Sequence, residues 1–243
     1  TGHDAKNIKE NRIGIGAKVS LIRAGDVIPH IERVIEPAPQ AHFPEKGTYT
    51  WTDTKVDIVL ISSATDTTVR AKQFEYFFKT MDIPDIGIGV INQLVKSGYD
   101  TLSKILHITY EELLELPSFK STKATKIYNN IQTVRTPPST STSNSISITP
   151  NELLAKLITA STVMGRGIAT KTAVLILDTY PDIISSQEDP KTKYAKLLTV
   201  KGLGDKTSKA FVENIPKFRQ FLANNGLESY LSLQETAINS SQQ

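Results

Sequence analysis

The sequence of 243 residues predicts a multidomain α+β protein, in which part of a small β-barrel precedes a mainly helical array. Two kinds of periodicity support this: alternation typical of strands over roughly the first 60 residues, and helical spacing of apolar residues from Val69 onward. A short turn, with glycine in three of its four copies, also recurs in the helical part. The chain therefore divides into a β part and an α part.

The β part begins with two strands and a turn. Residues 13–23 alternate and contain β-branched side chains, residues 24–26 form a turn, and residues 27–35 return as a second strand. Pro29 places that second strand at an edge or a bulge. Because two short strands are not stable alone, they predict part of a barrel.

A connector follows the two strands. Proline-rich residues 36–50 predict a loop, and the alternation over residues 51–62 predicts one further strand. Trp51 is the single tryptophan of the chain, and we expect it in the core rather than on the surface as a base-stacking platform.

The turn motif is clearest at Gly202-Leu203-Gly204, which precedes a helical pattern. The two glycines allow a sharp turn into a helix, while the leucine enters the core between two helices. The amides of the turn then point outward beside the positive end of the helix dipole, where a phosphate can bind. This is the form of a helix-hairpin-helix motif, which grips the DNA backbone without reading bases.

Positions equivalent to Gly204 are Gly87, Lys120 and Ala169. Only the last copy keeps both glycines, and the second has Ser118 and Lys120 in their places. An ordinary helix-turn-helix connection explains any single copy, and for the second copy we favour it. Four copies in one register favour an array of small helical units with a shared core.

Charge and composition narrow the function. The net charge is only +3, but six lysines gather in residues 191–209, Lys120, Lys123 and Lys126 follow the second turn, and Arg166 and Lys171 flank the third. Each cluster taken alone is explained by basic side chains on a solvent-exposed face. The position of these basic clusters at three of the four turns instead favours contact with phosphate.

Several sites are excluded by residue type. The chain has no cysteine, so it has no disulfide, thiol nucleophile or cysteine-ligated zinc, and its four histidines show no metal spacing. No apolar run approaches the ~20 residues of a membrane helix. The chain does not begin with methionine, and we expect it to be cut from a longer protein.

The predicted domains follow from these patterns. Residues 136–150 are rich in Ser and Thr and predict a linker, and residues after 233 predict a frayed polar tail. The expected order is a truncated barrel, a connector, a first hairpin pair, the linker, a second hairpin pair and the tail, at residues 1–36, 37–69, 70–135, 136–150, 151–226 and 227–243.

The motifs resemble a known family. The stretch Arg23-Ala-Gly-Asp-Val-Ile-Pro29, with His3 and Ile13-Gly14 upstream, resembles the OB-fold signature of NAD-dependent DNA ligases. Met81–Gly87 resembles the opening of the helix-hairpin-helix domain of that family, and residues 157–173 and 198–208 resemble its later hairpins. The resemblance covers about residues 1–226.

Two departures from the family stand out. The family usually carries a four-cysteine zinc finger after the OB fold, whereas residues 36–69 contain no cysteine, so no zinc is expected. A connector of this kind is similar to those of large DNA viruses. The adenylation domain is also missing: Lys55-Val-Asp-Ile58 lacks the glycine of the Lys-x-Asp-Gly motif and follows the OB fold, so we reject Lys55 as its lysine.

The resemblance implies a reaction and its partners. Members of the family seal nicks in duplex DNA in replication and repair, using a lysine that takes AMP from NAD and a divalent metal such as Mg²⁺. Here NAD and metal are expected outside this chain, and no catalytic residue is assigned. The implied partners are nicked duplex DNA and the missing N-terminal adenylation domain, inside a cell and away from membranes.

The resemblance also suggests DNA-binding residues. Arg23 would contact backbone near the nick, and Val27 and Ile28 would pack against the minor groove, although barrel core is an equal alternative for this apolar pair. In the hairpins, the candidates are residues whose turn amides or positive side chains could contact phosphate: Gly87, Lys120, Arg166, Gly167, Lys171, Gly202, Gly204 and Lys206. Lys120 either supplies a charge in place of the missing glycine turn or belongs to a hairpin that no longer touches DNA.

Two other functions compete with this one. An OB fold followed by tandem hairpins also resembles a non-enzymatic subunit that binds branched or junction DNA. A nucleotide-binding enzyme is the third possibility, but residues 165–172 and 202–207 lack the Gly-x-x-x-x-Gly-Lys-Ser/Thr spacing of a phosphate-binding loop.

Overall fold

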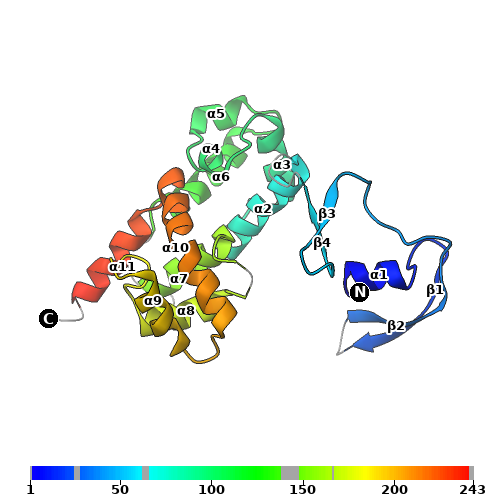
Figure 1. The fold of residues 1–243 in the computed structure, drawn as a ribbon. Helices are drawn as coiled ribbons and strands as arrows, with labels where there is room; N and C mark the ends of the chain where they lie inside the picture. Colours follow the sequence, from blue (N-terminus) through cyan, green and yellow to red (C-terminus); the bar gives the residue numbers. More distant parts are fainter. Residues whose placement is uncertain (1, 25–27, 62–65, 138–147, 166, 241–243) are drawn as a thin grey trace. The chain divides into compact units, whose positions relative to one another are not determined.

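The computed structural model of the chain describes residues 2–24, 28–61, 66–137, 148–165 and 167–240. It divides into two compact units, Thr1–Asp66 and Thr67–Gln243, which we call the N-terminal unit and the helical unit (Figure 1). Within these ranges the chain is a mixed α and β protein, as the sequence predicts.

The N-terminal unit contains two separate antiparallel hairpins. Strands β1 (Lys18–Ala24) and β2 (Ile28–Glu36) pair with irregularities at Lys18/Val19 and Ser20/Leu21, and β3 (Tyr49–Trp51) pairs with β4 (Ile58–Leu60). The expected pair of strands is thus confirmed. No closed barrel forms among the described residues.

The single strand expected over residues 51–62 is wrong, because a turn divides it. The Thr52 amide donates to the carbonyl of Asp57 over 2.9 Å, and the Lys55 amide donates to the carbonyl of Thr52 over 2.8 Å. The Thr52 hydroxyl also accepts from the Asp57 amide, at 3.4 Å. Threonine and aspartate side chains that bond nearby backbone favour turns over strands.

A short helix, α1 (Ala5–Glu10), precedes the strands. The carboxylate of Asp4 caps it by accepting from the Asn7 amide over 2.7 Å. The Lys6 amide donates to the carbonyl of Val56 over 2.9 Å, which joins α1 to the β3–β4 hairpin.

Little of the N-terminal unit is buried. Ala5 and Ala38 are the buried apolar side chains in its described part, while Leu21 is 59% exposed and Ile35 58%. Trp51 is only half-buried, so the expectation of a core tryptophan is wrong. A pair of two-stranded sheets offers too little surface to enclose a core.

The helical unit contains ten helices in its described residues. Their bounds are α2 (Thr67–Thr80), α3 (Ile88–Lys96), α4 (Leu102–Leu106), α5 (Tyr110–Glu115), α6 (Ser121–Arg135), α7 (Pro150–Ser161), α8 (Thr170–Thr179), α9 (Pro190–Leu198), α10 (Asp205–Asn225) and α11 (Ser229–Ser240). One continuous core joins them, with Phe77 and Phe78 of α2 and Phe218 of α10 buried in it.

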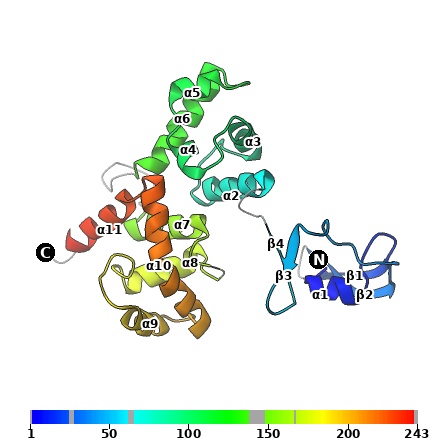
Figure 2. The same ribbon diagram turned by 45° about the horizontal axis from the view of Figure 1, so that its top comes forward.

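Helix α10 packs against several other helices of the unit. It contacts α4, α7 and α9, as Figures 1 and 2 show for the orange helix between the green and yellow groups. Pro216 lies inside it, and the helix continues because Phe211, Ile215 and Phe218 bury one face on both sides of the proline. The helical pattern expected after Gly204 is confirmed, but one helix continuous through Pro216 is not evident from sequence, since proline normally ends or kinks a helix.

The expected frayed tail is wrong for the described residues. Helix α11 packs on α7, and Tyr230 is only 2% exposed. The Tyr230 hydroxyl donates to the carbonyl of Val134 over 2.9 Å, and the Gln234 amide donates to Asn151 Oδ1 over 2.8 Å. Leu227, Tyr230 and Gln234 recur at helical spacing, a signal that the polar composition of the segment obscures.

Removing one atom tests the docking of α11. Tyr230→Phe leaves the buried Val134 carbonyl without its donor, and we expect a loss of about 1–2 kcal/mol in the free energy of unfolding by urea titration. Tyr76→Phe is the control, because Tyr76 is 44% exposed and should lose almost nothing. Equal stability of the two variants would show that α11 is not anchored here.

Candidate nucleic-acid interface

The four turns of the helical unit share one backbone geometry. The residues at Gly87, Lys120, Ala169 and Gly204 are the N-caps of α3, α6, α8 and α10, and all have φ between −92° and −82° with ψ between 164° and 178°. Two residues earlier, φ is positive at Asp85, Ser118, Gly167 and Gly202. The positions aligned from sequence are thus structurally equivalent.

A buried apolar residue lies inside each turn. Ile86 is 3% exposed, Phe119 4%, Ile168 7% and Leu203 9%. The expected burial of Leu203 between two helices is confirmed. This residue points into the core while its neighbours stay at the surface, so each turn projects its following amides outward.

None of these four N-caps supplies a side-chain acceptor to its helix. Five other helices do have such caps, from Asp4, Thr101, Thr109, Thr149 and Asp189. The first amides of α3, α6, α8 and α10 therefore lack the side-chain acceptor that the other starts have. Uncapped amides at the positive end of a helix dipole are suited to an anion.

Two kinds of glycine occupy the turns. Gly167 and Gly202 have φ of +95° and +87°, which other residues adopt only with strain. Gly87 and Gly204 have negative φ, and a Cβ atom at either would meet nothing within 4 Å. Neither the backbone conformation nor the packing of the described residues therefore requires glycine at positions 87 and 204.

The third and fourth turns lie side by side. A Cβ atom placed on Gly167 would come within 3.7 Å of the Thr207 hydroxyl, in the first turn of α10. Two uncapped helix starts, those of α8 and α10, are thus neighbours on one rigid core.

Exposed lysines accompany these starts. Lys171 and Lys206 lie in the first turns of α8 and α10, Lys120 is the N-cap of α6, and Lys201 and Lys209 lie close to the fourth turn. In the described part of the chain, no carboxylate pairs with any of these five. Their charge is free to meet an anion.

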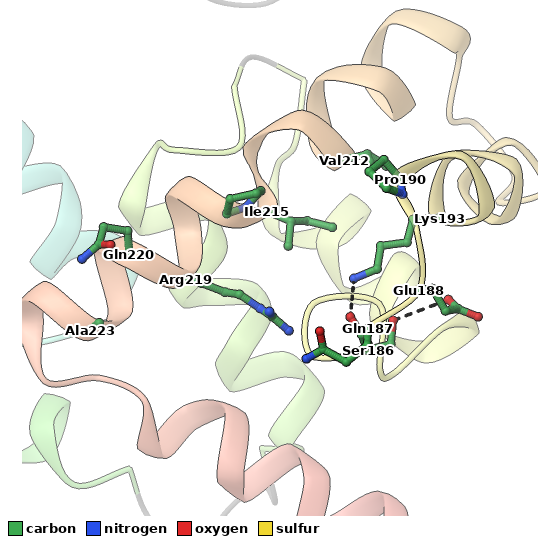
Figure 3. A pocket seen from close by; sticks show the side chains of 11 residues that line it. Ser186, Gln187, Glu188, Pro190, Lys193, Val212, Ile215, Arg219, Gln220 and Ala223 are labelled. Atoms are coloured by element: carbon green, nitrogen blue, oxygen red, sulfur yellow. Dashed lines mark hydrogen bonds between the residues drawn. The ribbon is translucent and has the colours of Figure 1, made fainter.

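Other lysines of the predicted basic faces serve the fold. Lys193 is 5% exposed and donates to the carbonyl of Ser186 over 2.8 Å, beside Arg219, which donates to the Ile184 carbonyl over 2.8 Å (Figure 3). Burial, with the nearby Arg219 charge, lowers the pKa of Lys193. Both side chains hold the 184–186 segment against α9 and α10, beside a cavity of about 500 Å³.

Three more of these lysines have partners. Lys196 pairs with Glu188, Lys126 pairs with Asp85 at 3.0 Å, and Lys123 donates to Gln93 Oε1 over 3.0 Å. The basic surface at the second turn is therefore smaller than the sequence predicts. Helical spacing places lysines on one face but does not reveal which acids pack against it.

Asp205 is the one acid among the lysines of residues 191–209, and its carboxylate has a hydrogen-bond partner on a neighbouring helix. The Tyr194 hydroxyl on α9 donates to its carboxylate. This hydrogen bond raises the pKa of Tyr194. Sequence reasoning missed the pair because it joins two helices.

The first turn differs from the last two. Asp85 occupies its positive-φ position, and the Pro84 carbonyl accepts from Asn130 Nδ2 over 2.9 Å. Together with the Asp85–Lys126 pair, this contact braces the first turn against α6. The positive-φ residue of the first turn is thus held by side chains of α6, whereas the fourth turn has a glycine at that position.

The remaining candidates lie partly outside the described residues. Arg23 is exposed on β1 opposite Pro29, and Ile28 begins β2 opposite Ala24. Val27 and Arg166 fall outside the described residues, as does most of the expected linker, residues 138–147.

The described ranges contain neither a candidate metal site nor a candidate membrane span. There, no group of three or more histidine and acidic side chains is arranged to hold a metal ion. No helix in those ranges has the length and apolar character needed to span a bilayer.

Comparison with known proteins points to DNA ligases. No family model matches the chain. It is 34% identical over 223 residues to the DNA ligase of Acanthamoeba polyphaga mimivirus, covering 91% of this chain and 33% of the relative. It is 28% identical over 209 residues to the putative DNA ligase 205R of Invertebrate iridescent virus 6, covering 86% of this chain and 29% of the relative.

A cellular protein shows the same relation. The chain is 26% identical over 232 residues to the DNA ligase of a Sulfurovum species, covering 88% of this chain and 31% of the relative. The chain spans about a third of the length of these relatives. Most of it is thus similar to one portion of proteins named DNA ligase.

The two kinds of turn glycine should respond oppositely to substitution. Gly202→Ala places a Cβ atom at φ +87° and should cost about 1–2 kcal/mol of unfolding free energy. Gly204→Ser adds a capping hydroxyl at an unstrained position and should be neutral or stabilise by a few tenths of a kcal/mol. Urea titrations of both variants measure this, and equal losses would contradict the turn geometry.

Proposed function

We propose that this chain is the DNA-binding C-terminal portion of an NAD-dependent DNA ligase that seals nicks in duplex DNA in replication and repair. The observation that carries the proposal is the pair of adjacent uncapped helix starts at Gly167–Lys171 and Gly204–Lys206. Similarity to proteins named DNA ligase over about nine-tenths of the chain supports it.

The turns are helix-hairpin-helix motifs in this proposal. A backbone phosphate oxygen would accept from the first amides of α8 or α10, and Lys171 or Lys206 would supply the opposite charge. Such contacts fix the position of the duplex and carry no base information. The chain would therefore bind duplexes of any sequence.

The four turns would contribute unequally. The third and fourth have glycine at the positive-φ position and exposed lysines that no carboxylate pairs with in the described part of the chain, and the acid in the first turn of α10, Asp205, accepts from Tyr194. Gly87 would add a weaker contact because Asp85 lies beside it, and Lys120 would offer charge at the second turn. The main grip is thus assigned to the second hairpin pair.

The β1–β2 hairpin would be part of the OB fold. Arg23, exposed on β1, would contact backbone near the nick, with Val27 and Ile28 toward the minor groove. An apolar pair there would favour a widened groove.

The cofactors of the reaction are not placed on this chain. The family uses NAD and Mg²⁺, but the described residues include no cluster suited to a metal, and the sequence has no Lys-x-Asp-Gly motif. The chain alone would bind DNA, with NAD and metal held by another part of the ligase.

A fluorescence-anisotropy salt titration tests the substrate. We expect nicked and intact duplexes to bind best, with log affinity falling linearly against log salt concentration, because released counterions accompany each phosphate contact. Four-way junction and single-stranded DNA are the comparison substrates. A junction preferred by tenfold or more, about 1.4 kcal/mol, would favour the junction-binding module instead.

Gly204→Val tests the grip itself. The branched side chain fits the extended backbone of residue 204 but covers the first amides of α10, so duplex affinity should fall about tenfold for every sequence tried. Ser232→Val, exposed on α11, is the matched control and should bind normally. A loss confined to some sequences would contradict a phosphate grip.

A further inference from the structure

The N-terminal unit holds a surface cavity of about 480 Å³ around the single tryptophan of the chain. Lys6, Lys9 and Glu10 of α1 line it, together with Trp51 and Lys55 of the β3–β4 hairpin. None of these residues belongs to the turns of the helical unit.

The cavity is built from two elements that the backbone joins. The backbone amide of Lys6 donates a hydrogen bond to the Val56 carbonyl, which fixes α1 beside the hairpin. Lys55 has φ of +55°, and its backbone amide donates a hydrogen bond to the carbonyl of Thr52, which holds it in the turn. Three lysines from two segments thus line one cavity together with the indole ring.

A flexible side chain lies over the indole on the cavity side. Lys9 Nζ lies over the ring, 5.4 Å from its centroid, and Lys9 itself is exposed. Phe43 supports the indole from the protein, with ring centroids 5.9 Å apart. Moving Lys9 aside would open a flat aromatic surface without disturbing packed core.

The charge around the ring is positive. Glu10 lies 3.9 Å from Lys6, so this acid is partly neutralised. In the described part of the chain, Lys9 and Lys55 have no carboxylate partner. A cationic ligand would be repelled here, whereas a ligand with a flat ring and a nearby anion matches both features.

We propose that this cavity binds a nucleotide, with its base stacked on Trp51 and its phosphate held by Lys9 and Lys55. Aromatic stacking accepts any base, and lysines that follow the backbone supply most of the affinity for single strands. The nucleotide belongs to an unpaired stretch of a nucleic-acid strand or is a free mononucleotide. The site is independent of the proposed phosphate grip on duplex DNA.

Intrinsic fluorescence tests the site directly, because Trp51 is the only tryptophan. Titrating the 243-residue chain with an eight-residue oligothymidylate at low salt should quench its emission saturably. A parallel titration with AMP distinguishes the sources: quenching by AMP at similar concentrations assigns a mononucleotide, and quenching by the oligonucleotide alone assigns an unpaired strand. No saturable quenching by either ligand would overturn the proposal.

Variants separate the cavity from general charge. Lys9→Gln combined with Lys55→Asn should weaken oligothymidylate binding at least tenfold, whereas Lys46→Gln, which removes a charge outside the cavity, should not. Asparagine tolerates the positive φ at residue 55. Equal losses in both proteins would overturn the site in favour of non-specific attraction.

Two further variants complete the test. Trp51→Phe should weaken binding of a dye-labelled oligothymidylate several-fold by anisotropy, because phenylalanine offers a smaller stacking surface, and circular dichroism checks its folding. Gly204→Val should leave the fluorescence titration unchanged even where it weakens duplex binding. If Gly204→Val abolished the quenching, the signal would come from the turns and the cavity would be excluded.

Discussion

Burial of one apolar side chain in each turn is the constraint on which the helical unit depends. Ile86, Phe119, Ile168 and Leu203 enter the core where the chain reverses between two helices. This forces the residue before each of them into positive φ and leaves the residue after it extended as an N-cap. The outward direction of the amides is therefore a consequence of hydrophobic packing, not of any contact at the surface.

The described helices whose N-caps are assigned begin in two ways, with or without a side-chain acceptor. At five helix starts an Asp or Thr side chain caps the first amides. At Thr109 and Thr149 a glutamate three residues later completes a capping box. At the four helices that follow the repeated turns, α3, α6, α8 and α10, the N-cap side chain makes no such hydrogen bond. Leaving the amides without a side-chain acceptor forgoes about 1 kcal/mol of capping at Ala169 and only a few tenths of a kcal/mol at Gly87 and Gly204, because glycine is itself a fair N-cap.

The register of the turns could be predicted from sequence because it depends on local signals: glycine at positive φ, an apolar residue and a helix start. Partners between distant segments could not. Lys193 and Lys126 look alike in sequence, yet the first is buried against the Ser186 carbonyl and the second is paired with Asp85. Trp51 was assigned to the core because tryptophan usually lies there, but the short β3–β4 hairpin encloses too little surface to bury it.

The proximity of Gly167 to Thr207 has a consequence for the kinetics of the proposed binding. If both helix starts accept phosphates as proposed, they would act as a bivalent receptor: once one phosphate is bound, the second would meet its partner at a high effective concentration. Dissociation would then require both contacts to break at the same time, which is slower than the loss of either contact alone. On this proposal a duplex would stay in place while individual contacts break and re-form.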